Sequence, residues 1–233
     1  MKYCLLLLLS FFLLGSIHHK PEKVVDYKEA CYVGRVNITY PDGRIVHVSC
    51  VPIRVVPKEQ QYEIYMLSVR HGIENSVKLS VDFFAGKTKF GYFISFAPVW
   101  SVKGVEVVKT SKDHDLTLLK AKSPKPVLPL KLADDMSLPF SRVISVGAAL
   151  GGAPIITEGL MSRYDDNFRQ VIITAPIVPG NSGGAVIDAK TGKLIGISTA
   201  VRWHRPGGHI NLVPHYQSAT PVSIIREFLK RKV

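Results

Sequence analysis

Short apolar segments, separated by turn residues, run through most of the chain and limit its fold more than any other feature. Each segment has the length of a β-strand, and many alternate apolar and polar residues or are rich in β-branched residues. Between residues 31 and 122 no stretch has a convincing helical period, so this part is expected to be all-β. The predicted strands cover residues 32–40, 45–56, 63–69, 77–84, 90–96, 105–109, 116–120, 143–146, 155–161, 170–175, 185–188, 194–201 and 210–213.

Two further segments interrupt this series of strands. Residues 123–139 contain four prolines and predict an extended linker. Near the end of the chain, Thr220 is suited to cap a helix and Pro221 to its first position, and the apolar residues that follow fall on one helical face. The order of strands, linker, strands and helix predicts two small β-barrels or a β-sandwich, closed by a C-terminal helix.

The composition is that of a folded protein with a strong positive charge. Of the 233 residues, 46% are hydrophobic and 21% are charged, which provides enough apolar material for a core. The formal net charge of +12 favours contact with anionic surfaces. However, the lysines and arginines are scattered, and no basic stripe with interleaved aromatic residues occurs. We therefore expect no nucleic-acid binding.

The first seventeen residues differ from the rest. Lys2 precedes a nearly unbroken apolar run over 3–14, which is followed by Gly15 and Ser16. This arrangement is typical of a secretory signal, and the run is shorter than the roughly 20 apolar residues of a membrane span. A leucine falls where a cleavage site prefers a small residue, so an uncleaved membrane anchor is the alternative. Either way, we expect a secreted, periplasmic or membrane-tethered protein.

Three cysteines occur, and Cys4 lies in the N-terminal segment. Cys31 and Cys50 form an even pair in a chain that is expected to be exported, which suits a disulfide. If Asp42-Gly43 forms a two-residue hairpin loop, antiparallel register places Cys50 opposite Arg35 and not opposite Cys31. A bridge then needs an irregular strand, and the sequence leaves the pairing open.

The segment 179–185, with the sequence PGNSGGA, contains the sharpest chemical signal. Glycines around Ser182 permit a tight turn that points backbone N–H groups to one side. A serine on such a turn can attack a carbonyl carbon while the N–H groups of Gly180 and Ser182 stabilise the developing oxyanion. The same residues also suit an ordinary β-turn, and the segment alone does not decide between the two interpretations.

A serine nucleophile needs a base, and the base needs an acid that orients it. His71 lies where the predicted strand 63–69 gives way to a loop, which suits a side chain that faces a cleft. Asp115 comes just before the predicted strand 116–120, and Asp113 is its competitor. The order His, Asp, Ser along the chain is one of the orders found in catalytic triads. Taken singly, each residue also fits a loop or surface role.

Together, these segments resemble the trypsin-like serine peptidases, and most closely the protease domain of the HtrA/DegP-type group. The resemblance covers about residues 33–228 and is strongest in the serine segment, 174–185. The aspartate segment, 113–120, is similar to that of the family and selects Asp115 over Asp113. The remaining similar stretches are 67–73, 146–151, 157–162, 194–200 and 219–222.

The resemblance implies an all-β, chymotrypsin-like fold of two six-stranded antiparallel barrels with a C-terminal helix, in one peptidase domain over 24–233. No PDZ-like domain is expected after it. The implied parts are an N-terminal barrel over about 31–122, the linker over 123–139, a C-terminal barrel over 140–219 and the helix over 220–231.

The resemblance also implies a mechanism. Ser182 would attack a peptide carbonyl, His71 would take and return the proton, and Asp115 would orient His71. The backbone N–H groups of Gly180 and Ser182 would form the oxyanion hole, and no metal or organic cofactor would take part.

A substrate would pair as an extra β-strand along Thr199, Ala200 and Val201. The acidic residue that gives trypsin its basic preference would fall near Pro176. We therefore expect a small or medium apolar residue before the scissile bond.

Two regions depart from the family pattern. The interval between His71 and Asp115 is long for the HtrA-type group, and residues 87–100 predict an inserted hairpin whose aromatic residues rim the cleft. His204, His209 and His215 cluster near a Pro-Gly-Gly turn, but no carboxylate or cysteine joins them at a metal-ligand spacing. We interpret this cluster as a surface loop.

The sequence therefore predicts a serine endopeptidase that acts on proteins or peptides outside the cytoplasm. One rival hypothesis is a catalytically silent module of the same fold that binds a partner at the cell envelope. Another is a structural role at an envelope through the N-terminal segment and the basic surface. The sequence leaves the oligomeric state open.

Overall fold

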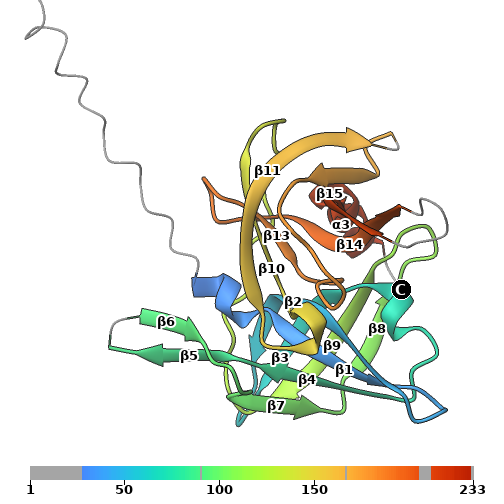
Figure 1. Ribbon diagram of the computed structural model, residues 1–233. Helices are drawn as coiled ribbons and strands as arrows, with labels where there is room; N and C mark the ends of the chain where they lie inside the picture. Colours follow the sequence, from blue (N-terminus) through green and yellow to red (C-terminus); the bar gives the residue numbers. More distant parts are fainter. Residues whose placement is uncertain (1–27, 90, 166, 205–210, 232–233) are drawn as a thin grey trace, which may run out of the picture.

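The computed structural model describes residues 28–89, 91–165, 167–204 and 211–231, and it contains two β-units joined by a long connection (Figure 1). The backbone is mostly extended, and helix α3 follows the last strand. The prediction of an all-β, two-unit fold with a C-terminal helix is therefore confirmed. Among the described residues, no helix is long and apolar enough to cross a membrane. The predicted N-terminal signal or anchor lies outside the described residues.

The first unit is a curled, antiparallel sheet of seven strands in the order β7-β4-β1-β2-β3-β9-β8. Unlike the expected six-stranded barrel, its end strands β7 and β8 are not paired with each other. Its elements are η1 (Lys28–Tyr32), β1 (Gly34–Thr39), β2 (Ile45–Pro57), β3 (Tyr62–Ser68), α2 (Arg70–Ile73), β4 (Lys78–Phe83), β5 (Ala85–Thr88), β6 (Gly91–Ile94), β7 (Trp100–Lys103), β8 (Glu106–Thr110) and β9 (Thr117–Ser123).

The second unit is a closed six-stranded barrel in the order β10-β11-β12-β15-β14-β13, as predicted. Strand bulges in β11 and β14 interrupt the register, and such bulges help a small sheet to bend into a barrel. Its elements are β10 (Arg142–Gly147), η2 (Ala149–Gly151), β11 (Ile155–Asp165), β12 (Gln170–Ile173), β13 (Ala185–Asp188), β14 (Leu194–His204), β15 (Asn211–Pro221) and α3 (Val222–Lys230).

Two clusters of buried side chains form the core. One fills the closed barrel, and the other draws residues from both units and from α3. Strand β10 shows how both are built, because successive side chains of a strand point to opposite faces. Val143 belongs to the barrel cluster, whereas its neighbour Ile144 belongs to the shared cluster with Leu67 and Ile225. The two units are thus held together by apolar contact.

The connection 124–141 also ties the units together. The Leu130 N–H donates to the Pro52 carbonyl in the first unit at 2.9 Å, and the Ala133 N–H donates to the Leu194 carbonyl in the second at 2.8 Å. Because it pairs with both units, the connection is a fixed strap and not only an extended linker.

The hairpin between β1 and β2 differs from the prediction. Its connection is the five residues 40–44, closed by the Tyr40 N–H and the Arg44 carbonyl at 3.0 Å, so Cys50 lies opposite Gly34 and not Arg35. Cys31 and Cys50 are both buried and are not joined by a disulfide. Burial raises the pKa of the Cys50 thiol to about 12, so this thiol is protonated and unreactive.

The helix prediction at the C-terminus was wrong in one detail. Thr220 belongs to β15, and Pro221 occupies the N-cap position without a side-chain hydrogen bond. The apolar face was placed as expected, because Ile224, Ile225 and Phe228 are buried.

Candidate active site

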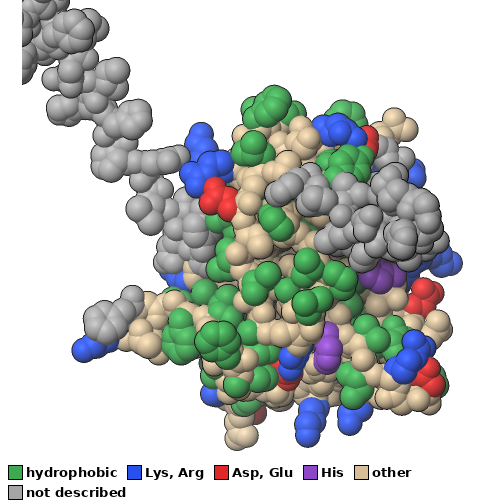
Figure 2. All heavy atoms as spheres, viewed as in Figure 1, with side chains coloured by type: hydrophobic (Ala, Val, Ile, Leu, Met, Phe, Trp, Pro, Cys, Tyr) green, Lys and Arg blue, Asp and Glu red, His purple; other side chains and the backbone are tan. Residues whose placement is uncertain are grey.

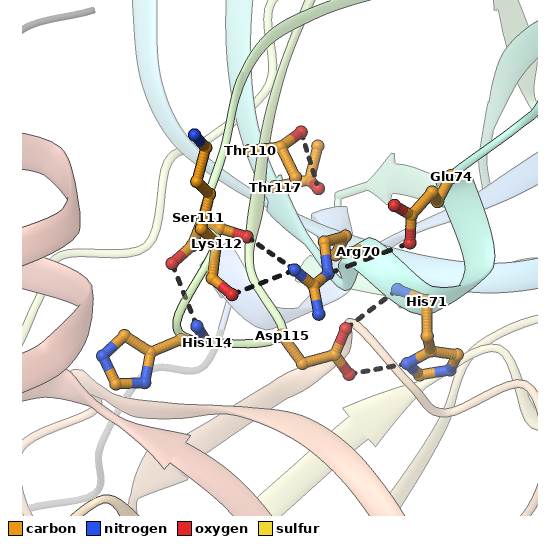
Figure 3. Close-up of polar contacts among 9 residues, drawn as sticks. All are labelled: Arg70, His71, Glu74, Thr110, Ser111, Lys112, His114, Asp115 and Thr117. Carbon is orange, nitrogen blue, oxygen red and sulfur yellow. Dashed lines mark hydrogen bonds and ion pairs between the residues drawn. The ribbon is translucent and has the colours of Figure 1, made fainter.

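His71 and Asp115 form a hydrogen-bonded pair within the first unit (Figure 3). His71 lies in α2, which follows β3 after one residue, and Asp115 lies near the end of the loop between β8 and β9. The His71 Nδ1 lies 2.6 Å from Asp115 Oδ2, and the His71 backbone N–H donates to Oδ1 at 2.9 Å. An ionised carboxylate only accepts hydrogen bonds, so Nδ1 carries the proton and Nε2 is left as the basic nitrogen of the neutral ring.

The charge of Asp115 is stabilised by these contacts. Burial alone would raise its pKa, but the hydrogen bonds from the ring and the backbone N–H of His71 outweigh that effect and keep the pKa below its ordinary value. The side chain of Asp115 is 28% exposed and that of His71 is 52% exposed. The aspartate is therefore covered while the ring remains open to a ligand.

Arg70 holds the loop that carries Asp115. Its guanidinium donates to the carbonyls of Ser111 and Lys112, each at 3.1 Å, and Figure 3 shows the side chain reaching across from α2 to that loop. His114 is turned away from Asp115 in the same view. Arg70 was not among the predicted residues, and its position next to His71 was the only available signal.

Ser182 lies on a tight turn between β12 and β13. Gly180 and Gly183 have φ values of 96° and 85°, in the region that side chains other than glycine rarely adopt. A Cβ on Gly183 would lie 2.1 Å from the Ser49 carbonyl oxygen and 2.7 Å from Ser68 Oγ. The turn therefore packs directly against β2 and against the end of β3, three residues before His71.

Most backbone groups of this turn have partners. The Pro179 carbonyl accepts from the Leu150 N–H and the Asn181 carbonyl from the Gly184 N–H, while the Asn181 N–H donates to Val178. Within the described part of the chain, the N–H groups of Gly180 and Ser182 make no hydrogen bond. These two groups are the donors predicted for an oxyanion hole, and they remain available for a ligand.

Ser49 fixes the turn from the other unit. Its N–H donates to the Ser182 carbonyl at 2.7 Å, and its hydroxyl donates to the Gly180 carbonyl and accepts from the Ala148 N–H, both at 2.8 Å. Ser49 is completely buried. Sequence reasoning missed it, because a serine within a strand carries no signal of this role.

The structure therefore brings His71 and Asp115 together directly, and it brings Ser182 to the same boundary between the units through Ser49. No hydrogen bond joins the Ser182 hydroxyl to His71 among the described residues. Such contacts are often long without a substrate.

The predicted substrate-binding residues lie around the turn. Pro176 is exposed, and its carbonyl accepts from Thr157 Oγ1 at 2.9 Å. Strand β14 pairs with β13 only up to Ile197, so beyond Ser198 its second edge has no strand partner in the described ranges. Thr199, Ala200 and Val201 lie on that edge, although the side chains of Ala200 and Val201 are outside the described part.

Two further sequence features are the predicted inserted hairpin and the histidine cluster. The predicted inserted hairpin exists as β5 and β6, but Figure 1 shows it projecting beside η1, on the far side of the first unit from β8. Tyr92 packs against Tyr32 of η1 with ring centroids 6.2 Å apart. Tyr92 is thus directed toward η1, and the predicted contact of the hairpin's aromatic residues with a cleft stays a prediction. The side chains of the predicted histidine cluster lie outside the described residues, and the described ones contain no group of three potential metal ligands.

Comparison with known proteins relates this arrangement to a family. The model of the trypsin-like peptidase domain matches residues 28–197. A serine protease HtrA-like protein of Staphylococcus epidermidis is 28% identical over 179 residues, which is 69% of this chain and 28% of that protein. The anti-sigma-I factor RsgI9 of Acetivibrio thermocellus is 35% identical over 103 residues, or 43% of this chain and 14% of that protein. This chain thus spans less than a third of these relatives.

Solved structures share the fold. The serine endoprotease from Yersinia pestis superimposes with a TM-score of 0.64 at 18% identity, covering 88% of this chain and 66% of that chain. The HtrA-type protease AlgW with a tripeptide gives a TM-score of 0.63 at 21% identity, covering 88% and 63%.

Proposed function

Because this chain belongs to the trypsin-like peptidase family, we propose that it is a serine endopeptidase with Ser182 as nucleophile, His71 as base and Asp115 as the acid that orients the base. The observation that carries the proposal is the pair of hydrogen bonds from His71 to Asp115. They fix both the tautomer and the direction of the imidazole, which is the task of the acid in a catalytic triad.

The proposed reaction has two halves. The Ser182 Oγ bonds to the peptide carbonyl carbon while its proton moves to His71 Nε2. The C–N bond then breaks, the amine leaves with that proton, and an acyl-enzyme remains. Water, activated by the same nitrogen, adds to the acyl carbon and releases the acid and the Ser182 hydroxyl. No cofactor is required for any of these steps.

The developing oxyanion is proposed to bind to the N–H groups of Gly180 and Ser182. The hydrogen bonds of the surrounding turn support this role, because they fix the neighbouring peptides and leave these two donors unused. Donors that are oriented in advance stabilise a transition state more than donors that must first reorganise.

The substrate is proposed to pair with the open edge of β14 at Thr199, Ala200 and Val201. Pro176, in place of an acidic residue, favours a small or medium apolar residue before the scissile bond. Strict cleavage after Lys or Arg in a peptide library would contradict this preference.

The test is labelling of the purified full-length chain by a fluorophosphonate probe, which reacts only with activated serines. Wild type is expected to react, whereas Ser182→Ala and His71→Ala are expected to stay unlabelled. His114→Ala is the matched control, because the side chain of this neighbouring histidine makes no hydrogen bond to Asp115 among the described residues, and it should react like wild type.

A folded wild type that does not react would contradict the peptidase proposal. The catalytically silent binding module would then be the better hypothesis, and the absence of a hydrogen bond between Ser182 and His71 favours testing it. Circular dichroism of each variant shows whether a loss of labelling comes from a loss of fold.

The apolar run 3–14 supports a location outside the cytoplasm, as a secreted, periplasmic or tethered protein. Protein or peptide substrates are the proposed partners, and the charge of +12 also suits an anionic surface. Gel filtration and fractionation of cells test the oligomeric state and the location.

A further inference from the structure

The hairpin of β5 and β6 stands apart from the rest of the first unit. Among the described strands, these two pair only with each other, and Figure 1 shows them projecting from the body of the molecule. One face of the hairpin is attached, because the Tyr92 ring packs against Tyr32 of η1. Side chains alternate along a strand, so Phe93 lies on the opposite face, over Gly86, and is 44% exposed.

A short loop after β6 presents a second phenylalanine. The Ser95 N–H donates to the Phe84 carbonyl at 2.8 Å, which fixes the start of the loop. The Val99 N–H donates to the Phe83 carbonyl at 2.8 Å, which fixes its end. Phe96 lies between these two bonds and is fully exposed. The projection thus holds two phenylalanine rings toward solvent, where they contribute little to the core.

The charged residues of the projection all have the same sign. Residues 85–99 contain no acidic residue, and their charged residues are Lys87 and Lys89, which are both exposed. The Lys87 ammonium lies 5.5 Å from the centre of the Tyr92 ring. Figure 2 shows a basic side chain at the end of the projection and hydrophobic side chains along it. Aromatic rings beside lysines fit the surface of an anionic bilayer, because the rings enter between the lipids while the ammonium groups contact the headgroup phosphates.

Two observations favour a bilayer over a second copy of this chain. Lys87 stands on β5, and a lysine on an open strand discourages pairing with another strand. The hairpin also contacts η1, with which the described part begins, and only the thirteen residues 15–27 separate η1 from the apolar run 3–14. Thirteen residues span at most about 45 Å. A membrane that held the apolar run would therefore lie within reach of the hairpin.

We propose that the hairpin of β5 and β6 binds the surface of an anionic lipid membrane, with Phe93 and Phe96 inserted between the lipids and Lys87 and Lys89 at the phosphates. The contact is shallow, because the open backbone edges of a two-stranded hairpin need water as their hydrogen-bond partner. This site is independent of the proposed peptidase activity, so Ser182→Ala should bind membranes like wild type.

The test uses Phe96→Trp in the full-length chain, on vesicles of equimolar phosphatidylcholine and phosphatidylglycerol. The emission of the new indole is taken as the difference from wild type, which contains Trp100 and Trp203. We expect it to shift to shorter wavelength and to be quenched by brominated lipid chains. Phe140→Trp is the matched control, because Phe140 is also exposed but lies in the connection between the units. Its indole should stay unquenched.

The lysines are tested by adding Lys87→Gln and Lys89→Gln to Phe96→Trp. At one subsaturating lipid concentration, the ratio of quenched to unquenched indole on the anionic vesicles should fall roughly 25-fold, about fivefold for each lysine. On vesicles of phosphatidylcholine alone, the two substitutions should change this ratio little.

An indole in Phe96→Trp that stays unquenched overturns the inference, whether or not the chain sediments with the vesicles. Equal quenching in Phe96→Trp and Phe140→Trp also overturns it, and equal quenching on the two kinds of vesicle with both lysines present does the same. An emission shift that needs no vesicles and grows with protein concentration would assign the hairpin to contact with a second copy. None of these outcomes affects the peptidase proposal, which the fluorophosphonate probe tests separately.

Discussion

The two halves of the candidate site are built in different ways. His71 and Asp115 belong to one unit, contact each other directly, and are linked again through Arg70 and the loop 111–115. The turn of Ser182 belongs to the other unit, and its position relative to His71 depends on bonds that cross between the units. One half is therefore complete within the curled sheet, whereas the other is completed only when the sheet and the barrel pack together.

This difference shows where the site is vulnerable. Substitutions in the His–Asp half directly alter the tautomer and orientation of the His71 base, because His71 and Asp115 are hydrogen-bonded to each other. Changes in the crossing bonds alter the geometry of the oxyanion donors while the base remains intact. The following predictions separate these effects, from the largest to the smallest.

The largest effect is expected for Asp115→Asn, which removes the acid from the His–Asp half. The amide cannot hold His71 in the required tautomer, so kcat should fall by about 10⁴. Asp113→Asn is the control, because among the described residues the Asp113 carboxylate accepts a hydrogen bond only from Arg231, at 3.3 Å, and its activity should stay within about twofold of wild type. Steady-state kinetics on one peptide measures both. Equal losses of kcat in the two variants would contradict the assignment of the orienting role to Asp115 alone.

The next effect concerns the stability of the first unit. Asp82 accepts from Arg35 at 2.6 Å, Asn37 at 2.8 Å and Ser101 at 2.5 Å. Burial alone would raise the pKa of Asp82, but these hydrogen bonds lower it below its ordinary value of 3.8. The carboxylate therefore stabilises the fold above that pH, and the contribution is lost as the pH falls through the lower folded pKa.

Asp82→Asn should reduce the free energy of unfolding by about 3 kcal/mol at neutral pH, because it leaves the partly buried Arg35 without its counter-ion. The difference from wild type should shrink below pH of about 4. Urea unfolding across this pH range measures it. If the difference in unfolding free energy between wild type and Asp82→Asn grew as the pH fell, the ionised Asp82 carboxylate would not be the source of the stability.

Ser49→Ala tests the bonds that cross between the units. It leaves the Gly180 carbonyl and the Ala148 N–H without their partner, a loss of about 1–3 kcal/mol. If the lost hydrogen bonds let the N–H groups of Gly180 and Ser182 move out of position, kcat should drop by roughly 10- to 100-fold with a smaller change in KM. Ser76→Ala, in the turn that follows α2, is the control and should not change kcat. Unchanged kcat in Ser49→Ala would mean that the turn does not depend on the first unit.

The smallest effect is expected for Arg70→Gln, which weakens the attachment of the Asp115 loop without removing a reacting group. We expect kcat to fall by about tenfold, since two charge-assisted hydrogen bonds to carbonyls are lost. Glu74→Gln removes only the 4.0 Å ion pair to the same arginine and should have almost no effect. A flattened pH profile in Arg70→Gln would indicate a role in the base itself, whereas a uniform loss supports positioning.

The sequence was informative wherever a structural feature depends on residues that are close together in the chain. The periodic strands, the glycines around Ser182 and the helix face of Ile225 follow from backbone and burial rules, and the structure has them as predicted. The four-residue helix α2 was missed, because it is too short for a helical period. The role of Ser49 was missed as well, since it depends on a packing contact with a turn 131 positions away.

Register was the weakest inference. The DG signal predicted a two-residue loop, but the connection 40–44 is longer, and the shift by one residue moved the partner of Cys50 from Arg35 to Gly34. Turn signals specify that a hairpin occurs more reliably than they specify its length.

The first sheet never closes, so it has two terminal strands, β7 and β8, whereas the barrel has none. Backbone groups on such edges can pair with a second chain during folding, and charged side chains discourage this. Lys103 on β7 and Glu106 and Lys109 on β8 stand at these edges, and Lys109 also binds the carbonyl of Phe228 in α3 at 2.5 Å. When the protein is refolded at high concentration, chains should therefore associate first through the edge strands of the curled sheet. The contact of Lys109 with α3 should make the β8 edge less accessible to a second chain.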